Sequence, residues 1–418
     1  MAGGGLYGRR GYTLAAACIL VAFMVAAPSY AAAHRARTYY VSVSGADTND
    51  GLSPTTPWRT LDRVASETLY PGDAVLFRGG DTFMGTLKTA SSGAIGAPIV
   101  FTSYGIGKPR IIAPGAAAAL YLRSNRYLRF EDLDVTAATS SCVQLSVFGD
   151  GSTDVSFSGL RIHDCGGAGL TASNLADARV VLAGSTIANT ENCGVFFRGS
   201  AFSITGNLIT NTGLDSSEAL SYPLHGIYAK GQNPTITDNT IVDFETSGIT
   251  IRFAKSDVEH NTIVARTRGT NGISYYQETA TPGTTTISGN TISGVSVLGI
   301  AIDNGSTTGA FGGGRTTAST SESFVVAGNS ITMRGDSAGY SVEGIRVFQV
   351  PSATVVGNRV QGRLSRVYNG FPPTRSYTER DNAWQTPSGA STFGWNGTAM
   401  PFRRYVGASR QGVGDTVF

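Results

Sequence analysis

Short runs in which apolar and polar residues alternate recur along most of the chain. Each run begins with glycine and an aliphatic residue, and the first and third residues after the glycine are apolar or aromatic in every copy. Successive side chains of a β-strand point to opposite faces, so this pattern predicts short strands with one buried face. The copies are AGLTASN from residue 168, CGVFFRG from 193, HGIYAKG from 225, SGITIRF from 247, NGISYYQ from 271, LGIAIDN from 298 and EGIRVFQ from 343.

A second phrase, asparagine followed two positions later by an aliphatic residue, alternates with the first. Spacings such as 261 − 239 = 22 and 358 − 329 = 29 are irregular. Two alternating phrases at such a period predict a solenoid with fixed strands and loops of variable length. Asparagines stacked at one turn position would form a hydrogen-bonded ladder, so we assign them a structural role. They are Asn207, Asn239, Asn261, Asn290, Asn329 and Asn358.

This repeat resembles the right-handed parallel β-helix of secreted polysaccharide-degrading enzymes of the pectate-lyase-like superfamily. The resemblance covers residues 38–370 and implies an all-β fold, a single-stranded right-handed parallel β-helix. We expect four segments along the chain. They are an export signal at 1–31, with cleavage after Ala31 or Ala33, N-terminal strands and a capping helix at 32–115, the β-helix at 116–365, and an irregular C-terminal covering at 366–418.

The expected capping helix rests on the spacing of apolar residues near the N-terminal end of the repeat. Leu61, Val64, Ala65 and Leu69 have helical spacing. This spacing predicts a short amphipathic helix over the open end of the first coil, where a solenoid needs a cap.

The first thirty residues have the pattern of a cleaved export signal. Arg9 and Arg10 precede an apolar run from Leu14 to Ala27, which is too short to span a bilayer comfortably. RRGYTL also resembles a twin-arginine motif, so Sec and twin-arginine export both stay open. We expect a secreted monomer that does not enter the membrane.

Charge and cysteine content narrow the picture further. Loss of residues 1–31 removes two arginines and lowers the formal charge from +3 to +1, which argues against nucleic acid as a partner. Cys142, Cys165 and Cys193 remain. An odd count allows one disulfide at most, between Cys165 and either of the others, and three small buried residues are the alternative.

The second and fourth residues after each glycine are expected to face outward. Coils stack about 4.8 Å apart, so the fourth positions place Arg198, Lys230 and Arg252 in one column of positive charge. Like charges placed opposite one another are destabilising, which suits an anionic ligand, although long side chains can also extend into water. The candidates for substrate binding on this face are Arg198, Phe196, Tyr228, Tyr276, Asp303 and Arg346.

A positive column with aromatic neighbours fits cleavage of an acidic polysaccharide by β-elimination. That reaction needs a base, a positive group that stabilises the enolate, and an acid for the leaving oxygen. The β-helical alginate and chondroitin lyase family pairs a lysine base with an arginine about one coil later, and Lys230 with Arg252 resembles that pair, at 252 − 230 = 22. Neighbouring positive charges favour the neutral amine that a base requires. His225 is a further catalytic candidate, either to neutralise a substrate carboxylate or to shuttle a proton.

The chain differs from that family where calcium would bind. Acidic residues shortly before the lysine hold calcium in the family, whereas Pro223 and His225 stand there in this chain. A calcium site of the family type is therefore not expected, and because the sequence has no dense cluster of cysteine, histidine or carboxylate residues, we expect folding to need no tightly bound metal. If Ca²⁺ binds, we expect a weak, substrate-linked site. The candidate ligands are Asp215, Glu218, Asp243 and Glu245.

Three alternatives to a lyase stay open at this stage. A glycoside hydrolase would need two facing carboxyl groups, and a non-catalytic carbohydrate-binding protein or a uronate epimerase would share the same outward face. Alginate, glycosaminoglycan, pectin and bacterial capsule all carry uronates, and the sequence does not separate them. The carboxyl candidates for a hydrolase are Asp243, Glu245, Glu278 and Asp303, of which only Asp303 lies in the outward column.

Overall fold

The structure is a computed structural model in which residues Ala36–Phe418 form one compact unit. Glu218, Glu278 and the predicted cleavage sites lie outside the described residues. Among the residues that are described, no helix is long and apolar enough to cross a membrane. The described residues are 35–215, 224–253, 255–277, 282–303, 322–335, 339–348, 350–370, 376–386 and 392–418.

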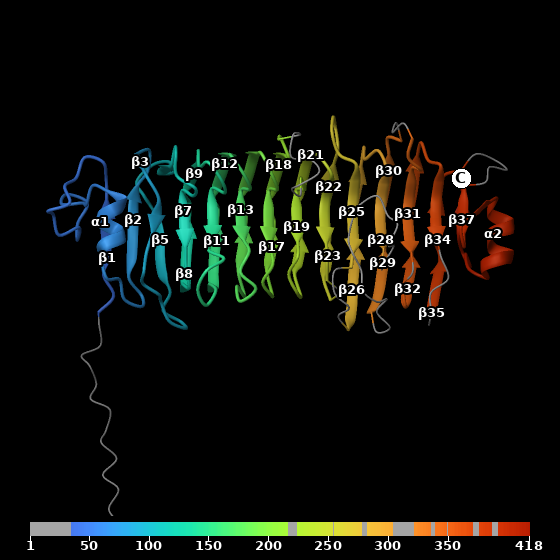
Figure 1. The fold of residues 1–418 in the computed structure, drawn as a ribbon, viewed down its shortest axis with the longest axis horizontal. Coiled ribbons are helices and arrows are strands. Elements are labelled where there is room, and N and C mark those ends of the chain that lie inside the picture. The colour runs from blue at the N-terminus through green and yellow to red at the C-terminus, as the bar shows by residue number, and fades with distance from the viewer. Residues whose placement is uncertain are drawn as a thin grey trace, which may run out of the picture. The chain divides into compact units, whose positions relative to one another are not determined.

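Three sheets of 13 strands each, here named A, B and C, run along the stack of coils (Figure 1). The chain visits the sheets in turn, so neighbours within a sheet come from successive coils, and every described pair is parallel except β37 with β38. Sheet A contains β1 (Thr38–Val41), β2 (Ala74–Arg78), β5 (Ile99–Tyr104), β8 (Arg126–Glu131), β11 (Thr153–Ser158), β14 (Val181–Ala183), β17 (Ser203–Thr205), β20 (Thr235–Thr237), β23 (Asp257–Glu259), β26 (Gly283–Ser288), β29 (Glu322–Ala327), β32 (Ser352–Val356) and β35 (Ser376–Arg380).

Sheets B and C close the coil. Sheet B contains β3 (Thr82–Met84), β6 (Arg110–Ile112), β9 (Asp134–Thr136), β12 (Arg161–Cys165), β15 (Thr186–Thr190), β18 (Leu208–Thr212), β21 (Thr240–Phe244), β24 (Thr262–Val264), β27 (Thr291–Ser293), β30 (Ser330–Met333), β33 (Arg359–Gly362), β36 (Ala383–Trp384) and β39 (Thr416–Val417). Sheet C contains β4 (Leu87–Lys88), β7 (Leu120–Leu122), β10 (Val143–Leu145), β13 (Leu170–Ala172), β16 (Val195–Phe197), β19 (Ile227–Ala229), β22 (Ser247–Ile251), β25 (Asn271–Tyr276), β28 (Leu298–Asp303), β31 (Glu343–Phe348), β34 (Arg366–Gly370), β37 (Phe393–Trp395) and β38 (Thr398–Met400).

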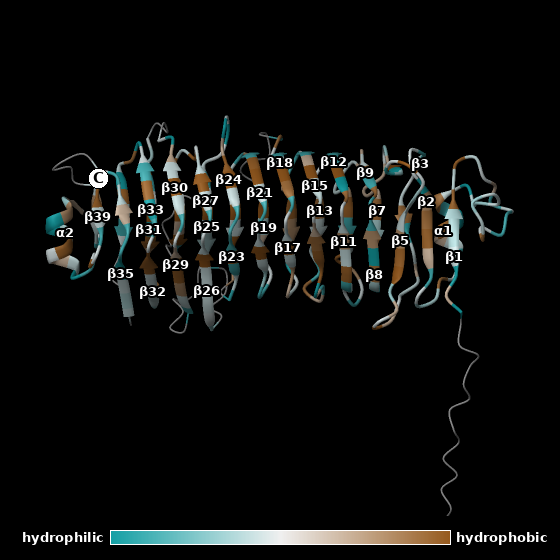
Figure 2. Cartoon of the chain, turned by 180° about the vertical axis from the view of Figure 1, so that it is seen from behind, coloured by the Kyte–Doolittle hydropathy of each residue, from teal (hydrophilic) through white to brown (hydrophobic). Residues whose placement is uncertain are grey.

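The interior of the coils is filled by the apolar positions of the repeated strands. Figure 2 shows apolar and polar segments alternating along the strands. Ile249 and Ile251 are fully buried, and all the first and third positions predicted to face inward from residue 195 onward are at most 1% exposed. The predicted register of sheet C and the parallel β-helix are therefore confirmed.

The asparagine ladder predicted from the second phrase is present and buried. The Asn239 side-chain amide donates to Oδ1 of Asn261 at 3.0 Å, and the Asn261 amide donates to Oδ1 of Asn290 at 3.0 Å. Each residue before the asparagine has a positive φ, as at Gly206 (64°) and Asp238 (58°), which turns the chain into the next sheet. The ladder runs through Asn207, Asn239, Asn261, Asn290, Asn329, Asn358 and Asn382.

The three cysteines lie in neighbouring coils, and one disulfide joins two of them. Cys142 and Cys165 are bonded, with Cα atoms 5.5 Å apart, while Cys193 is a buried thiol outside this disulfide. Burial raises the pKa of the Cys193 thiol to about 12, so this thiol is not a nucleophile at neutral pH.

A helix covers each end of the stack (Figure 1). α1 (Leu61–Ser66) begins at Thr60, whose hydroxyl accepts a hydrogen bond from the Arg63 amide, and it buries Leu61 and Val64 as the apolar spacing predicts. The helix ends before Leu69, which the same spacing assigned to it and which is buried beyond its end. At the other end α2 (Phe402–Ser409) buries Tyr405. Each cap packs against the open coil end and shields its apolar interior.

The stacked strands continue beyond the boundary that was predicted at residue 365. β34 to β39 all fall within the segment 366–418, which was expected to be irregular. The sequence repeat is hard to recognise there because aromatic side chains fill the last coils. The rings of Trp384 and Phe393, for example, pack with their centroids 5.9 Å apart. Asn382, however, continues the ladder after Asn358. Its sequence Asn-Ala-Trp is a variant of the asparagine phrase with tryptophan in the aliphatic position, and it could have indicated that the coils continue.

A buried carboxyl group sits beneath α2. Glu379 accepts hydrogen bonds from Asn382 (2.8 Å) and from the Tyr405 hydroxyl (3.0 Å). Burial, together with the adjacent Asp415 carboxyl group, raises the pKa of Glu379 to about 9. The C-terminal cap is therefore assembled around a protonated acid at neutral pH.

The ladder predicts that Asn261→Ala is strongly destabilising. The change removes the oxygen that accepts the Asn239 backbone and side-chain amides (both 3.0 Å) and the donor to the Ile236 carbonyl oxygen (2.8 Å). Each buried polar group left without a partner costs about 1–3 kcal/mol. We expect urea titration to show the free energy of unfolding lowered by at least ~2 kcal/mol. Thr262→Ala, at the adjacent outward position, should be milder, and an equal loss in both variants would contradict this account.

The Glu379 environment predicts that stability falls as the pH rises. Between its ordinary pKa of 4.5 and the folded value of about 9, the folded protein keeps a proton that the unfolded chain has released. The free energy of unfolding should then fall with a slope of up to about 1.4 kcal/mol per pH unit for this group. Glu379→Gln cannot ionise, so its melting temperature should depend less on pH from 5 to 9. Parallel curves for the two proteins would refute the assignment.

Candidate functional site

The predicted site residues occupy equivalent positions in successive strands on the outward face of sheet C. Phe196 pairs with Tyr228, and Tyr228 pairs with Thr250, in successive coils. Directly after these strands, the Lys230 amide donates to the Phe197 carbonyl oxygen (2.8 Å) and the Arg252 amide to that of Ala229 (2.9 Å). Arg198, Lys230 and Arg252 therefore follow one another in a column, and all three are half-buried.

Tyr228 is the centre of the aromatic and basic groups on this face. Its ring stacks on Phe196, with centroids 5.5 Å apart and planes inclined by 24°. The His225 ring lies 4.9 Å away, and Nζ of Lys230 lies 5.9 Å from the Tyr228 centroid. This arrangement offers a flat apolar surface beside a cation, as carbohydrate rings with a charged substituent would require.

His225 lies between two coils and carries no charge at neutral pH. The ring is half-buried beneath Tyr228, and its Nδ1 lies 3.5 Å from the Thr250 hydroxyl oxygen. Burial, and secondarily the positive charge of Arg252, lowers the pKa of His225 to about 3. A neutral imidazole gives no positive charge to a substrate carboxylate, so of the two predicted roles only proton transfer fits.

The same column continues into an aromatic residue and a carboxylate. Tyr276 pairs with Asp303 in the next coil, and Asp303 pairs with Phe348 in the coil after that. The Asp303 carboxylate faces Nη2 of Arg346 at 3.4 Å, and Arg346 also stacks over Phe348, 5.6 Å from its centroid. The column thus changes from cationic to charge-balanced along the helix axis.

Glu343 is a member of this face that sequence reasoning missed. Its carboxylate is 3% exposed and lies 3.1 Å from Arg366 and 3.9 Å from Arg346. Glu343 stands immediately before the glycine of its phrase, as His225 does, and only positions after the glycine were assigned to the outward face. The recurrence of polar residues before the glycine was the available signal.

Between the two groups of large side chains the outward positions are small. Thr250, Ser274 and Ala301 occupy successive coils, and each is at most 2% exposed. Arg252 and Tyr276 are therefore the large polar side chains in this part of the face.

The carboxylates proposed for calcium are engaged in other ways or lie outside the described residues. Asp243 accepts the backbone amides of Arg266 (2.8 Å) and Thr267 (3.1 Å), and Glu245 faces Arg268 at 3.5 Å. Within the described ranges, no group of three or more histidine, cysteine or acidic side chains could hold a metal ion. Asp243 lies in β21 with a positive φ of 52°, and its contacts with backbone amides explain its presence.

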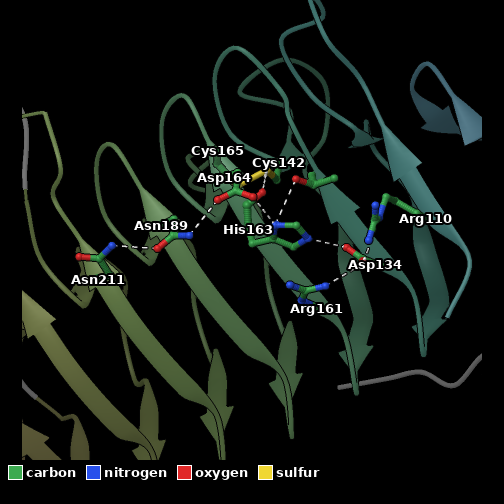
Figure 3. Close-up of polar contacts among 10 residues, drawn as sticks. Arg110, Asp134, Cys142, Arg161, His163, Asp164, Cys165, Asn189 and Asn211 are labelled. Atoms are coloured by element: carbon green, nitrogen blue, oxygen red, sulfur yellow. Dashed lines mark hydrogen bonds and ion pairs between the residues drawn. A yellow bond between two sulfur atoms is a disulfide. The ribbon is translucent and has the colours of Figure 1, made fainter. Parts of the chain in front are cut away.

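A second polar cluster lies on the outward face of sheet B (Figure 3). Nε2 of His163 lies 2.8 Å from Asp134 and Nδ1 lies 2.6 Å from Asp164, while Arg110 and Arg161 also contact Asp134. Both ring nitrogens are thus occupied by neighbouring side chains. This network ties adjacent coils together.

Comparisons with known proteins address the fold. A family model described as a right handed beta helix region matches residues 145–313, and no curated protein sequence matches the chain. The GH136 lacto-N-biosidase from Eubacterium ramulus superposes with a TM-score of 0.54 at 14% identity, over 91% of this chain and 67% of that one. XylC in complex with xylose gives 0.56 at 10% identity, over 86% of each chain. The alginate lyase from Paenibacillus sp. str. FPU-7 gives 0.44 at 16% identity, over 86% of this chain and 99% of that one. With the sheet topology described above, the family model identifies the fold as a right-handed parallel β-helix.

Proposed function

We propose that this protein is a secreted enzyme that cleaves a uronate-containing polysaccharide by β-elimination. The observation that carries the proposal is the registered column of Arg198, Lys230 and Arg252 beside the stacked Phe196 and Tyr228 rings. Stacked coils repeat about every 4.8 Å, so the column presents closely spaced cations to an extended anionic chain. The same fold occurs in proteins described as acting on carbohydrates, which supports a carbohydrate substrate.

In this proposal Lys230 is the base and Arg252 holds the uronate carboxylate. Removal of the proton beside the carboxylate builds negative charge on its oxygens, and a fixed guanidinium stabilises that charge. His225, uncharged and held beneath Tyr228, would position the ring and accept a hydrogen bond from the sugar.

Secretion is part of the same proposal. The disulfide between Cys142 and Cys165 is typical of proteins that fold in an oxidising compartment, and an extended polysaccharide would be met outside the cell. The substrate would bind along the face of sheet C without any need for a second subunit.

A second candidate function is glycoside hydrolysis, favoured by one observation. Asp303 and Glu343 are both largely buried, and a single guanidinium, that of Arg346, lies 3.4 Å from the first and 3.9 Å from the second. Two carboxyl groups near one bond are the usual requirement of a glycosidase. Because both are neutralised by arginines, we rank this reaction below elimination.

The first test is a panel of acidic and neutral polysaccharides incubated with the secreted protein. Elimination leaves a conjugated double bond at each new non-reducing end, so we expect ultraviolet absorbance to rise in step with reducing ends on at least one uronate polymer. Reducing ends without absorbance would favour hydrolysis through Asp303 and Glu343. Cleavage of neutral polymers alone would end the proposal.

The second test separates the roles of two residues. Lys230→Ala should lower kcat by about 10²- to 10⁴-fold, the usual loss for a general base. Arg252→Ala should lower kcat/KM as well, because the developing enolate loses its fixed positive partner. Lys88→Ala, a lysine at the N-terminal end of the same sheet, is the matched control and should leave turnover unchanged. A folded Lys230→Ala enzyme with normal activity, alongside an inactive Asp303→Asn, would transfer the assignment to hydrolysis.

A further inference from the structure

Elimination at the proposed site needs a group that protonates the leaving oxygen, and the outward column contains one neutral donor in the right place. Tyr276 lies one coil after Arg252, since Ile251 pairs with Tyr275, and one coil before Asp303, with which it pairs directly. The order along the helix axis is therefore Lys230, Arg252, Tyr276. A uronate whose carboxylate rests on Arg252 would place its acidic C–H towards Lys230 and its glycosidic oxygen towards Tyr276.

We propose that the Tyr276 hydroxyl is the general acid of this reaction. The inference rests on the proposed function and assigns the proton donor that the function leaves open. Lys230 takes the proton from the carbon next to the carboxylate, and that electron pair forms the new carbon–carbon double bond. The bond from the neighbouring carbon to the glycosidic oxygen breaks, and this oxygen takes the proton of Tyr276. Water then returns a proton to the phenolate, and the Lys230 ammonium releases its own to solvent.

The charges around Tyr276 suit both of its protonation states. Burial is the largest influence and raises the pKa of Tyr276, so the hydroxyl keeps its proton at neutral pH. A hydrogen bond with Ser274 and the guanidinium groups of Arg346 and Arg252 lower the pKa and favour the phenolate that forms when the proton is transferred, whereas the charge of Asp303 raises the pKa. Arg346 is held towards this position by its contact with Asp303 at 3.4 Å.

The other neutral groups on the face fit the role less well. His225 has a pKa lowered to about 3 and so carries no imidazolium proton to donate at neutral pH. Tyr228 stacks on Phe196 and lies beside His225, on the far side of Arg252 from Tyr276. A base and an acid on either side of Arg252 would bracket a single sugar, whereas Lys230 and Tyr228 belong to the same coil.

The test compares two leaving groups in Tyr276→Phe. One substrate is the uronate polymer cleaved by the parent enzyme, and the other is a uronate whose 4-oxygen carries a 4-nitrophenyl group. Nitrophenolate leaves without needing a proton, so loss of a general acid should lower kcat on the polymer by about 10²- to 10⁴-fold and lower it far less on the nitrophenyl substrate. KM should change little on either. The ratio of the two rates in one preparation does not depend on the fraction of folded protein.

The matched control is Tyr121→Phe, a tyrosine on the same outward face of sheet C, in the row of Tyr228 and Ser274 and in a distant coil. It should leave both rates unchanged. If Tyr276→Phe keeps the parent kcat on the polymer, or loses activity equally on both substrates, the inference is overturned while the elimination reaction stands. If the parent enzyme forms no unsaturated product from any uronate polymer, the proposed function itself fails.

Discussion

The spacing of hydrogen-bonded coils governs every other feature of this molecule. Parallel strands lie about 4.8 Å apart, so each residue of one coil sits directly over its counterpart in the next. Inside the coil this stacking joins like with like, as in the nearly parallel rings of Phe101, Phe130 and Phe157. Outside the coil it brings charges of one sign together, which a protein tolerates when a ligand or a counter-charge is present. The interior and the candidate site are two results of the same constraint.

Local patterns were sufficient to predict the interior of the fold. Ile249 and Ile251 alternate with polar residues, and the buried face follows from the strand period alone. The asparagine ladder was also predictable, because the side-chain amide of each asparagine can donate to the side-chain oxygen of the asparagine in the next coil. The apolar positions and the asparagine recur from coil to coil, so many weak sequence patterns predict the same fold.

Contacts that occur only once could not be predicted in this way. The ion pair between His163 and Asp134 depends on which residues of β9 and β12 share a register, and a full coil that includes β10 and β11 separates these two strands along the chain. Glu343 was missed because it precedes the glycine of its phrase, and only positions after the glycine were assigned to the outward face. The low pKa of His225 follows from burial beneath Tyr228, which no spacing in the sequence reveals.

The side-chain amides of the asparagine ladder form an aligned dipole along the axis of the coils. Each side-chain amide donates towards the C-terminal end, from Asn207 through to Asn382, so the amide dipoles add and polarise one another. The donating end meets a carboxylate, since the Asn382 backbone amide donates to Asp415 at 2.8 Å and its side chain at 3.3 Å. Asp415 therefore accepts hydrogen bonds at the positive end of the aligned amide dipoles, as an anion does at the N-terminus of a helix. One negative charge completes the dipole there, while the neighbouring Glu379 is kept neutral by its burial.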